Sequence, residues 1–153
     1  MAARRSDEGW VVVDGAARGF AQEITAGSHR LRADEPESSG GTATGPSPYD
    51  LLLAALGSCT SMTVALYARR KGWPLTHVTV RLRHSKIHAQ DCEQCETRET
   101  KLDLIESEIA FEGALDEAQR ARLLEIAMRC PVHRTLTSRI EIRTEAGQAP
   151  PAS

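Results

Sequence analysis

The sequence has almost no net charge. Its 153 residues carry 19 Lys and Arg against 21 Asp and Glu, which gives a formal net charge of −2. A protein that binds nucleic acid through a basic surface has a marked excess of positive charge, so this balance argues against that class. The length favours a single domain with a modest hydrophobic core.

The N-terminus lacks the apolar segment of a secretory signal peptide, because Met1–Glu8 is rich in Arg, Asp and Glu. We therefore expect a cytoplasmic protein, in a compartment where cysteines are kept reduced. The chain has four cysteines. In such a compartment they are expected to be catalytic, redox-active or metal-binding rather than a structural disulfide framework.

Charge is absent altogether between Leu51 and Ala68. Ser47, Pro48 and Asp50 precede this stretch and provide a helix cap, a favourable first helical residue and a capping-box partner. A helix that is apolar all round is buried in a protein core or in a membrane. The run falls slightly short of the roughly 20 apolar residues that span a bilayer and has hydroxyl groups in its middle. We therefore predict a core helix, with no membrane as partner.

The rest of the chain predicts short strands and one further helix. Gly72 is the expected end of the central helix, and Asp116 with Gln119 is expected to begin a second helix that Pro131 stops. Val132–Ser138 is expected to add one helical turn. The expected strands are 10–13, 20–24 and 29–33 as an antiparallel meander, 77–88 and 101–111 as a hairpin, and 139–143 as a last strand.

This order of elements predicts an α+β fold with antiparallel sheets packed around two long helices. Residues 1–146 are expected to form one domain, and 147–153 a flexible tail. The apolar central helix needs cover on several sides, which one chain of this length does not readily supply. We therefore expect a homodimer with the central helices at or near the interface.

Cys59 and Cys130 lie in the middle of the central helix and at the end of the second one. Two buried structural thiols are one interpretation, since free Cys is commonly buried. The other is a functional pair. The hydroxyls beside Cys59, that of Thr60 among them, are suited to stabilising a thiolate, and the imidazole of His133 near Cys130 is suited to lowering a thiol pKa.

Gly45–Thr60 (GPSPYDLLLAALGSCT) and Cys130–His133 (CPVH) together resemble the OsmC/Ohr family of osmotically inducible and organic hydroperoxide resistance proteins. The resemblance extends from about His29 to Thr144. It implies an intertwined α+β homodimer in which Cys59 is the peroxidatic thiol and Cys130 the resolving thiol. It also implies an external reductant, either a lipoylated protein or a dithiol.

One position departs from the family pattern. Ohr members have a glutamate ten residues before the first cysteine, paired with an arginine from the N-terminal strands, and here Tyr49 occupies that position. Asp50 carries the same charge as that glutamate and is a candidate to replace it, although a helix cap is the simpler interpretation of its role. Arg30 and Arg32 are the candidates for the arginine.

A second group of residues suggests metal chemistry. His84, His88, Cys92 and Cys95 fall within twelve positions, and a C-x2-C pair suits tetrahedral zinc. Because a single C-x2-C is a weak signal, we favour an exposed and redox-sensitive hairpin loop over a zinc site.

The leading hypothesis is a thiol-dependent peroxidase that needs no cofactor and reduces hydrogen peroxide or organic hydroperoxides in oxidative stress defence. A non-catalytic protein of the same fold that binds a small apolar or thiol-containing ligand is the alternative. A zinc-binding module built on the His84–Cys95 group is a third hypothesis.

Overall fold

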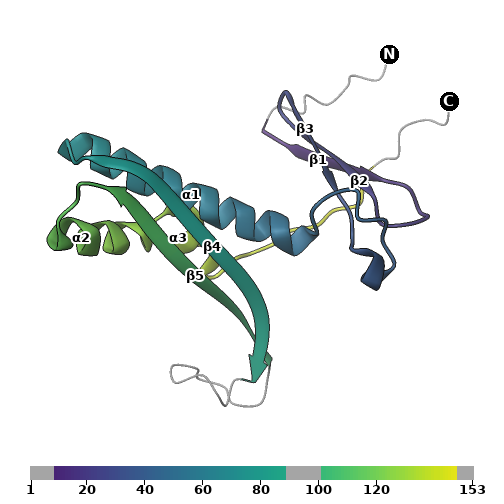
Figure 1. Ribbon diagram of the computed structural model, residues 1–153. Helices are drawn as coiled ribbons and strands as arrows, with labels where there is room; N and C mark the ends of the chain where they lie inside the picture. The colour runs from purple at the N-terminus through teal and green to yellow at the C-terminus, as the bar shows by residue number, and fades with distance from the viewer. Residues whose placement is uncertain (1–8, 89–100, 148–153) are drawn as a thin grey trace. The chain divides into compact units, whose positions relative to one another are not determined.

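The computed structural model describes residues 9–88 and 101–147 (Figure 1). Its elements form an α+β fold with two antiparallel sheets, one of three strands and one of two, as predicted. The chain divides into two compact units. The first unit contains residues up to 57 together with 81–108, and the second unit contains 58–80 together with the chain from 109 onward.

The N-terminal sheet belongs to the first unit and confirms the predicted meander. Its strands are β1 (Val11–Gly15), β2 (Gln22–Ala26) and β3 (His29–Ala33), paired antiparallel in the order β1-β2-β3. Val13, Ile24 and Leu31 lie opposite one another across the three strands. Ile24 is buried, whereas Val13 and Leu31 are exposed, so this sheet leaves apolar surface uncovered.

Asp34 organises the loop that leads from β3 to the central helix. Its side chain is buried, and its carboxylate accepts hydrogen bonds from the hydroxyls of Thr42 at 2.6 Å and Thr44 at 2.8 Å. The backbone N–H groups of Glu35, Thr42 and Thr44 donate to it as well. These donors, the Thr42 hydroxyl foremost, hold the pKa of Asp34 well below its ordinary value. A short 3-10 turn, η1 (Glu37–Ser39), lies within the loop.

The central helix α1 spans Pro48–Lys71, and both of its ends form as the sequence predicts. The Ser47 hydroxyl and N–H both donate to Asp50, and the Asp50 N–H donates back to Ser47 Oγ. At the other end Gly72 has φ of 66°, and the N–H of Trp73 donates to the Ala68 carbonyl at 2.9 Å. A left-handed glycine after the helix, followed by a residue whose N–H bonds to the carbonyl five positions earlier, is a Schellman motif.

The burial of α1 differs from the prediction of a helix enclosed on all sides. Within the single chain one stripe with a spacing of four residues is buried: Leu56, Thr60, Val64 and Ala68. Met62 is 70% exposed, and Leu66, one turn further, is exposed too. By length and composition alone α1 could cross a membrane. The packing of its buried stripe against helix α2, described below, favours a core helix instead.

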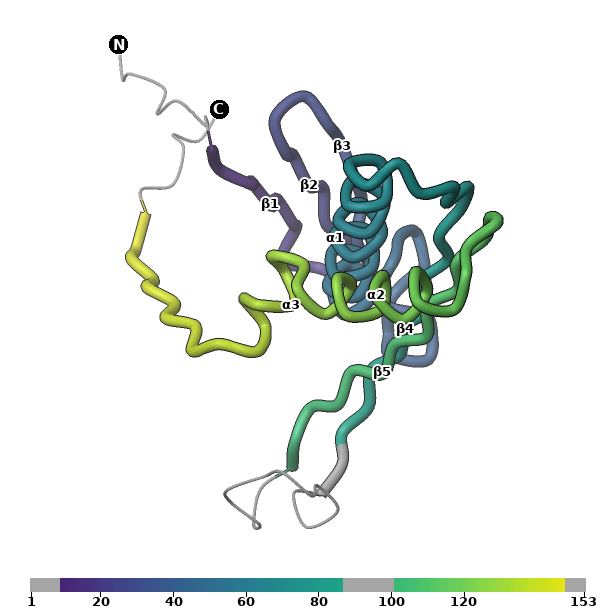
Figure 2. Tube along the Cα trace, turned by 90° about the vertical axis from the view of Figure 1, so that its left-hand side faces the viewer, coloured from purple at the N-terminus to yellow at the C-terminus, as the bar shows by residue number. Residues whose placement is uncertain are grey.

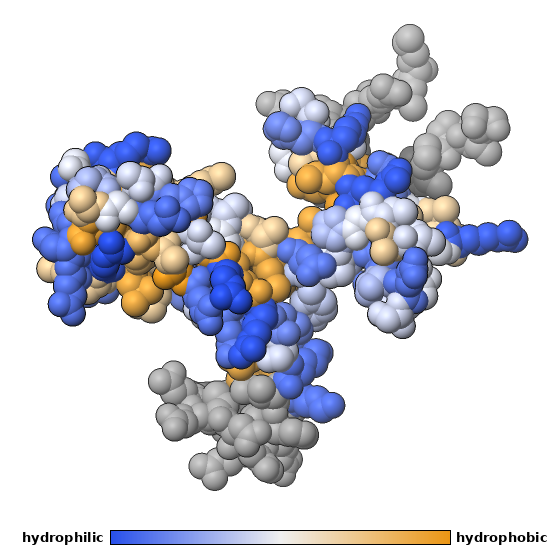
Figure 3. Space-filling view, in the orientation of Figure 1, coloured by the Kyte–Doolittle hydropathy of each residue, from blue (hydrophilic) through white to orange (hydrophobic). Residues whose placement is uncertain are grey.

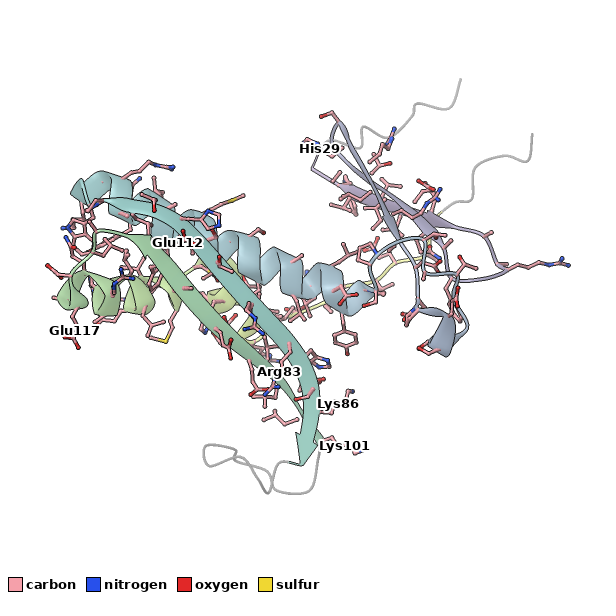
Figure 4. All side chains as sticks on the ribbon, in the orientation of Figure 1. His29, Arg83, Lys86, Lys101, Glu112 and Glu117 are labelled. Carbon is pink, nitrogen blue, oxygen red and sulfur yellow. The ribbon has the colours of Figure 1, made fainter. Side chains whose placement is uncertain are left out.

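The two long strands β4 (Leu75–His88) and β5 (Lys101–Gly113) pair with each other, as Figure 2 shows. Val78, Val80 and Leu82 are partly buried, while the alternate residues Thr79, Arg81 and Arg83 are exposed. Strand β4 therefore has one partly buried face and one exposed face along these residues. Cross-strand ion pairs line the exposed face: Arg81 pairs with Glu108 at 3.2 Å, and Arg83, which Figure 4 labels, pairs with both carboxylate oxygens of Glu106.

The core of the second unit lies between α1 and α2 (Glu117–Ala127). Its buried members are Val64 and Ala68 of α1 with Leu115, Leu123 and Ala127. Asp116 and Gln119 form the predicted capping box at the start of α2. Arg120 then ties the helix to the end of β5 by donating to the carbonyls of Phe111 at 2.6 Å and Gly113 at 3.1 Å.

Of the predictions for the C-terminal part, the further helical turn is confirmed and the last strand is wrong. Helix α2 ends at Ala127, before Pro131, and Pro131 begins the short helix α3 (Pro131–Leu136), with Cys130 as its N-cap residue. Proline suits the first helical position because its missing N–H has no partner there anyway. Residues 139–143 form no strand; Ile140 and Ile142 are exposed, and no strand in the described chain pairs with them. Apart from Gly147, the predicted tail lies outside the described residues.

Asp34→Asn is expected to lower the urea midpoint of unfolding at pH 7, because the carboxylate is the shared acceptor of the loop. A carboxyl group with a depressed folded pKa stabilises the protein above its unfolded pKa of about 3.9, and this stabilisation is lost as the pH falls below that value. The deficit of the variant relative to the wild type should therefore shrink from pH 7 to pH 3. Circular dichroism at both pH values measures it.

Asp14→Asn, which removes an exposed carboxylate of β1, is the matched control and should leave the midpoint unchanged. A deficit for Asp34→Asn that is equal at pH 7 and pH 3 would contradict this role of the Asp34 carboxylate.

Candidate functional site

The second unit brings a cysteine-containing site together from residues far apart in the sequence. Cys59 and Thr60 lie in the middle of α1, at the point where small and hydroxyl side chains replace leucine. Cys130 lies between α2 and α3, where the backbone is extended with φ of −62° and ψ of 146°. Thr60 belongs to the buried stripe of α1, so the packing of this stripe places it beside Cys130.

Cys130 is completely buried, and its sulfur has two polar neighbours. The backbone N–H of His133 donates to Cys130 Sγ at 3.3 Å, and the hydroxyl of Thr60 lies 3.5 Å from the same sulfur. The sequence had suggested that Thr60 serves Cys59 and that the His133 imidazole acts on a thiol. In the structure the Thr60 hydroxyl lies beside Cys130 instead. His133 contacts the Cys130 sulfur through its backbone N–H.

Cys59 is partly exposed, and both thiols are free. The Cys130 sulfur lies beside Thr60, the residue that directly follows Cys59 in α1. Two free thiols, one partly exposed within the chain and one that accepts a backbone hydrogen bond, are suited to thiol–disulfide chemistry.

The start of α1, in the first unit, holds Tyr49 and Asp50. Asp50 is engaged in the helix cap, and its bonds from Ser47 hold its pKa below the ordinary value. This confirms the simpler interpretation of Asp50, because the cap already uses its carboxylate. Tyr49 is about half exposed.

Tyr49 also takes part in a cluster that the sequence did not predict. The His84 ring stacks on the Tyr49 ring, with 4.3 Å between the centroids and 14° between the planes. His84 Nε2 in turn lies 2.7 Å from Asp103 Oδ1. The bond with His84, with a smaller effect of the Lys86 ammonium 3.8 Å away, lowers the pKa of Asp103. These residues come from α1, β4 and β5, and no local sequence signal connects them.

The arginine candidates have partners inside the N-terminal sheet. Arg32 forms a hydrogen-bonded ion pair with Glu23, its cross-strand neighbour on β2. Arg30 donates a hydrogen bond to the hydroxyl of Thr25, which is its own cross-strand neighbour on β2. Both arginines lie in β3, two residues apart and thus on one face of the sheet. Arg32 is therefore already paired with a carboxylate in its own sheet.

The suggested metal quartet is described only in part. The His84 ring stacks on Tyr49 and lies within hydrogen-bond distance of Asp103. Cys92, Cys95 and the side chain of His88 lie outside the described residues. Among the residues that the structure describes, no group of three or more His, Cys, Asp or Glu is arranged to hold a metal ion.

Comparison with protein families decides the relationship. The model of the OsmC-like protein family matches residues 40–145, which include α1, the β4–β5 hairpin and both described cysteines. The chain belongs to the OsmC-like family. This confirms the resemblance seen in the two cysteine motifs. A comparison with curated proteins finds no match.

Solved structures of the family share the fold at low sequence identity. The OsmC-like protein from Mycoplasma pneumoniae is 19% identical, with a TM-score of 0.63 over 82% of this chain and 84% of that one. The organic hydroperoxide resistance protein OsmC from Legionella pneumophila is 18% identical, with a TM-score of 0.60 over 83% and 88%. The organic hydroperoxide resistance protein OhrB of Bacillus subtilis is 18% identical, with a TM-score of 0.58 over 83% and 88%.

Proposed function

We propose that this protein is a cysteine-based peroxidase that reduces hydrogen peroxide or organic hydroperoxides in the cytoplasm. The observation that carries the proposal is the pair of free thiols, Cys59 partly exposed and Cys130 buried against Thr60, in a chain of the OsmC-like family. Organic hydroperoxide resistance proteins among the structural neighbours support the same reaction class.

The proposed chemistry uses the more exposed sulfur first. A thiolate at Cys59 attacks one peroxide oxygen, the O–O bond breaks, and the leaving oxygen takes up a proton to become water or an alcohol. The product on the protein is a sulfenic acid at Cys59. The Cys130 thiol then attacks this sulfenic acid and expels water, which leaves a Cys59–Cys130 disulfide. A dithiol or a lipoylated protein is the proposed reductant of this disulfide.

Cys59→Ser is expected to abolish turnover of cumene hydroperoxide with dihydrolipoamide, because the attacking sulfur is gone. Cys130→Ser should still consume one equivalent of peroxide and should then accumulate a sulfenic acid, which dimedone labels at residue 59. Peroxide loss, followed with a colorimetric assay, and mass spectrometry of the labelled peptide measure the two outcomes. Full turnover by Cys59→Ser would disprove the proposed role.

Tyr49 favours one second candidate, a non-catalytic binding protein of the same fold. Here an aromatic ring that is about half exposed, and held by His84, stands at the position of the Ohr glutamate. This candidate predicts a small apolar or thiol-containing ligand that raises the melting temperature of wild type and Cys59→Ser equally. A peroxide-dependent disulfide in the wild type separates the two candidates, since a binding protein does not require one.

We also propose that the protein is a homodimer whose interface includes α1. Large hydrophobic side chains are exposed in both units, and Figure 3 shows apolar surface uncovered on the face it presents. Met62 and Leu66 form an exposed apolar pair one turn apart on α1, away from its buried stripe. Exposed apolar surface is typical of a protein–protein interface, so these side chains are the candidates for the dimer contact.

Light scattering after size-exclusion chromatography should give twice the mass of one chain for the wild type. Met62→Glu should shift the protein toward the monomer, because it places an unpaired charge in the proposed interface. Ala118→Glu, at an exposed position in the first turn of α2, is the matched control and should remain dimeric. A wild type of single-chain mass would contradict the dimer.

A further inference from the structure

The two thiols of the site differ in two independent properties that matter for disulfide reduction. Within the single chain Cys130 has no exposed surface, whereas Cys59 is partly exposed. Cys130 Sγ also has two potential donors, the His133 N–H at 3.3 Å and the Thr60 hydroxyl at 3.5 Å. In thiol–disulfide exchange the rate depends on which sulfur the incoming thiolate can reach, and on how well the departing sulfur carries negative charge.

We infer that an external thiol attacks Cys59 and expels Cys130 as a thiolate, whose charge the Thr60 hydroxyl and the His133 N–H stabilise. This inference rests on the disulfide cycle proposed above and assigns the direction of its reductive half. Thr60 therefore acts on the leaving group in the exchange. The buried stripe of α1 holds it in place for this role, since Thr60 lies between Leu56 and Val64 on that stripe.

The step balances with a dithiol as the co-reactant. One thiolate of the dithiol forms a bond to Cys59 Sγ, the Cys59–Cys130 bond breaks, and its electron pair stays on Cys130. The second thiol of the dithiol then attacks the dithiol sulfur that is bonded to Cys59, and Cys59 is released as a thiolate. The dithiol leaves oxidised, as a cyclic disulfide, and both protein thiols are reduced.

The rate of reduction tests the role of Thr60. The disulfide is made with diamide, so the test does not depend on peroxide chemistry, and dihydrolipoamide is the reductant. Thr60→Val should be reduced about tenfold more slowly than the wild type, because a hydrogen bond to a charged group is lost. Thr60→Ser keeps a hydroxyl and should restore the rate. Thr135→Val, whose hydroxyl bonds to the Pro131 carbonyl instead, should match the wild type.

The position of the mixed disulfide tests the direction of attack on the wild-type protein alone. The oxidised protein is mixed briefly with limiting glutathione, quenched in acid, and alkylated in denaturant before peptide mass spectrometry. The expected product carries glutathione on Cys59 and the alkyl group on Cys130. Each of three results would overturn the inference. They are glutathione on Cys130 with the alkyl group on Cys59, equal reduction rates for wild type and Thr60→Val, and the absence of a Cys59–Cys130 disulfide after diamide. If diamide forms the disulfide and peroxide does not, the peroxidase proposal alone fails.

Discussion

The packing of one stripe of α1 against α2 is the contact on which the second unit depends. Val64 and Ala68 of this stripe meet Leu123 and Ala127 of α2 in the core, and Thr60 continues the stripe one turn toward the helix start. This turn contacts Cys130. A polar residue in an apolar stripe is costly unless it has a partner, and the Cys130 sulfur is the partner here. The same packing that stabilises the fold therefore positions the site.

The first unit uses polar contacts for the same purpose. The buried Asp34 carboxylate gathers the donors of the loop before α1, and the Ser47–Asp50 cap fixes where the helix starts. Tyr49 follows at once, with its ring stacked on His84. The residue at the position of the Ohr glutamate is thus held by aromatic stacking, while the carboxylate of Asp50 is used by the helix.

Features set by neighbouring residues were predictable from the sequence, and features set by distant ones were not. The Ser47–Asp50 and Asp116–Gln119 caps and the end of α1 at Gly72 each depend on residues a few positions apart. The Tyr49–His84 stack and the Thr60–Cys130 contact join residues 35 or more positions apart, so only the fold reveals them. Residues 139–143 alternate like a strand, but a strand forms only where another edge pairs with it.

The central claim is that Cys59 and Cys130 form one redox pair. Its most direct test mixes the fully reduced wild-type protein with one equivalent of cumene hydroperoxide, then measures the alcohol formed, the thiols lost and the position of any disulfide. The account predicts one alcohol for every two thiols lost, with a disulfide that joins Cys59 and Cys130. If these two thiols stay free while the peroxide persists, or if only Cys92 and Cys95 are oxidised, the claim is contradicted.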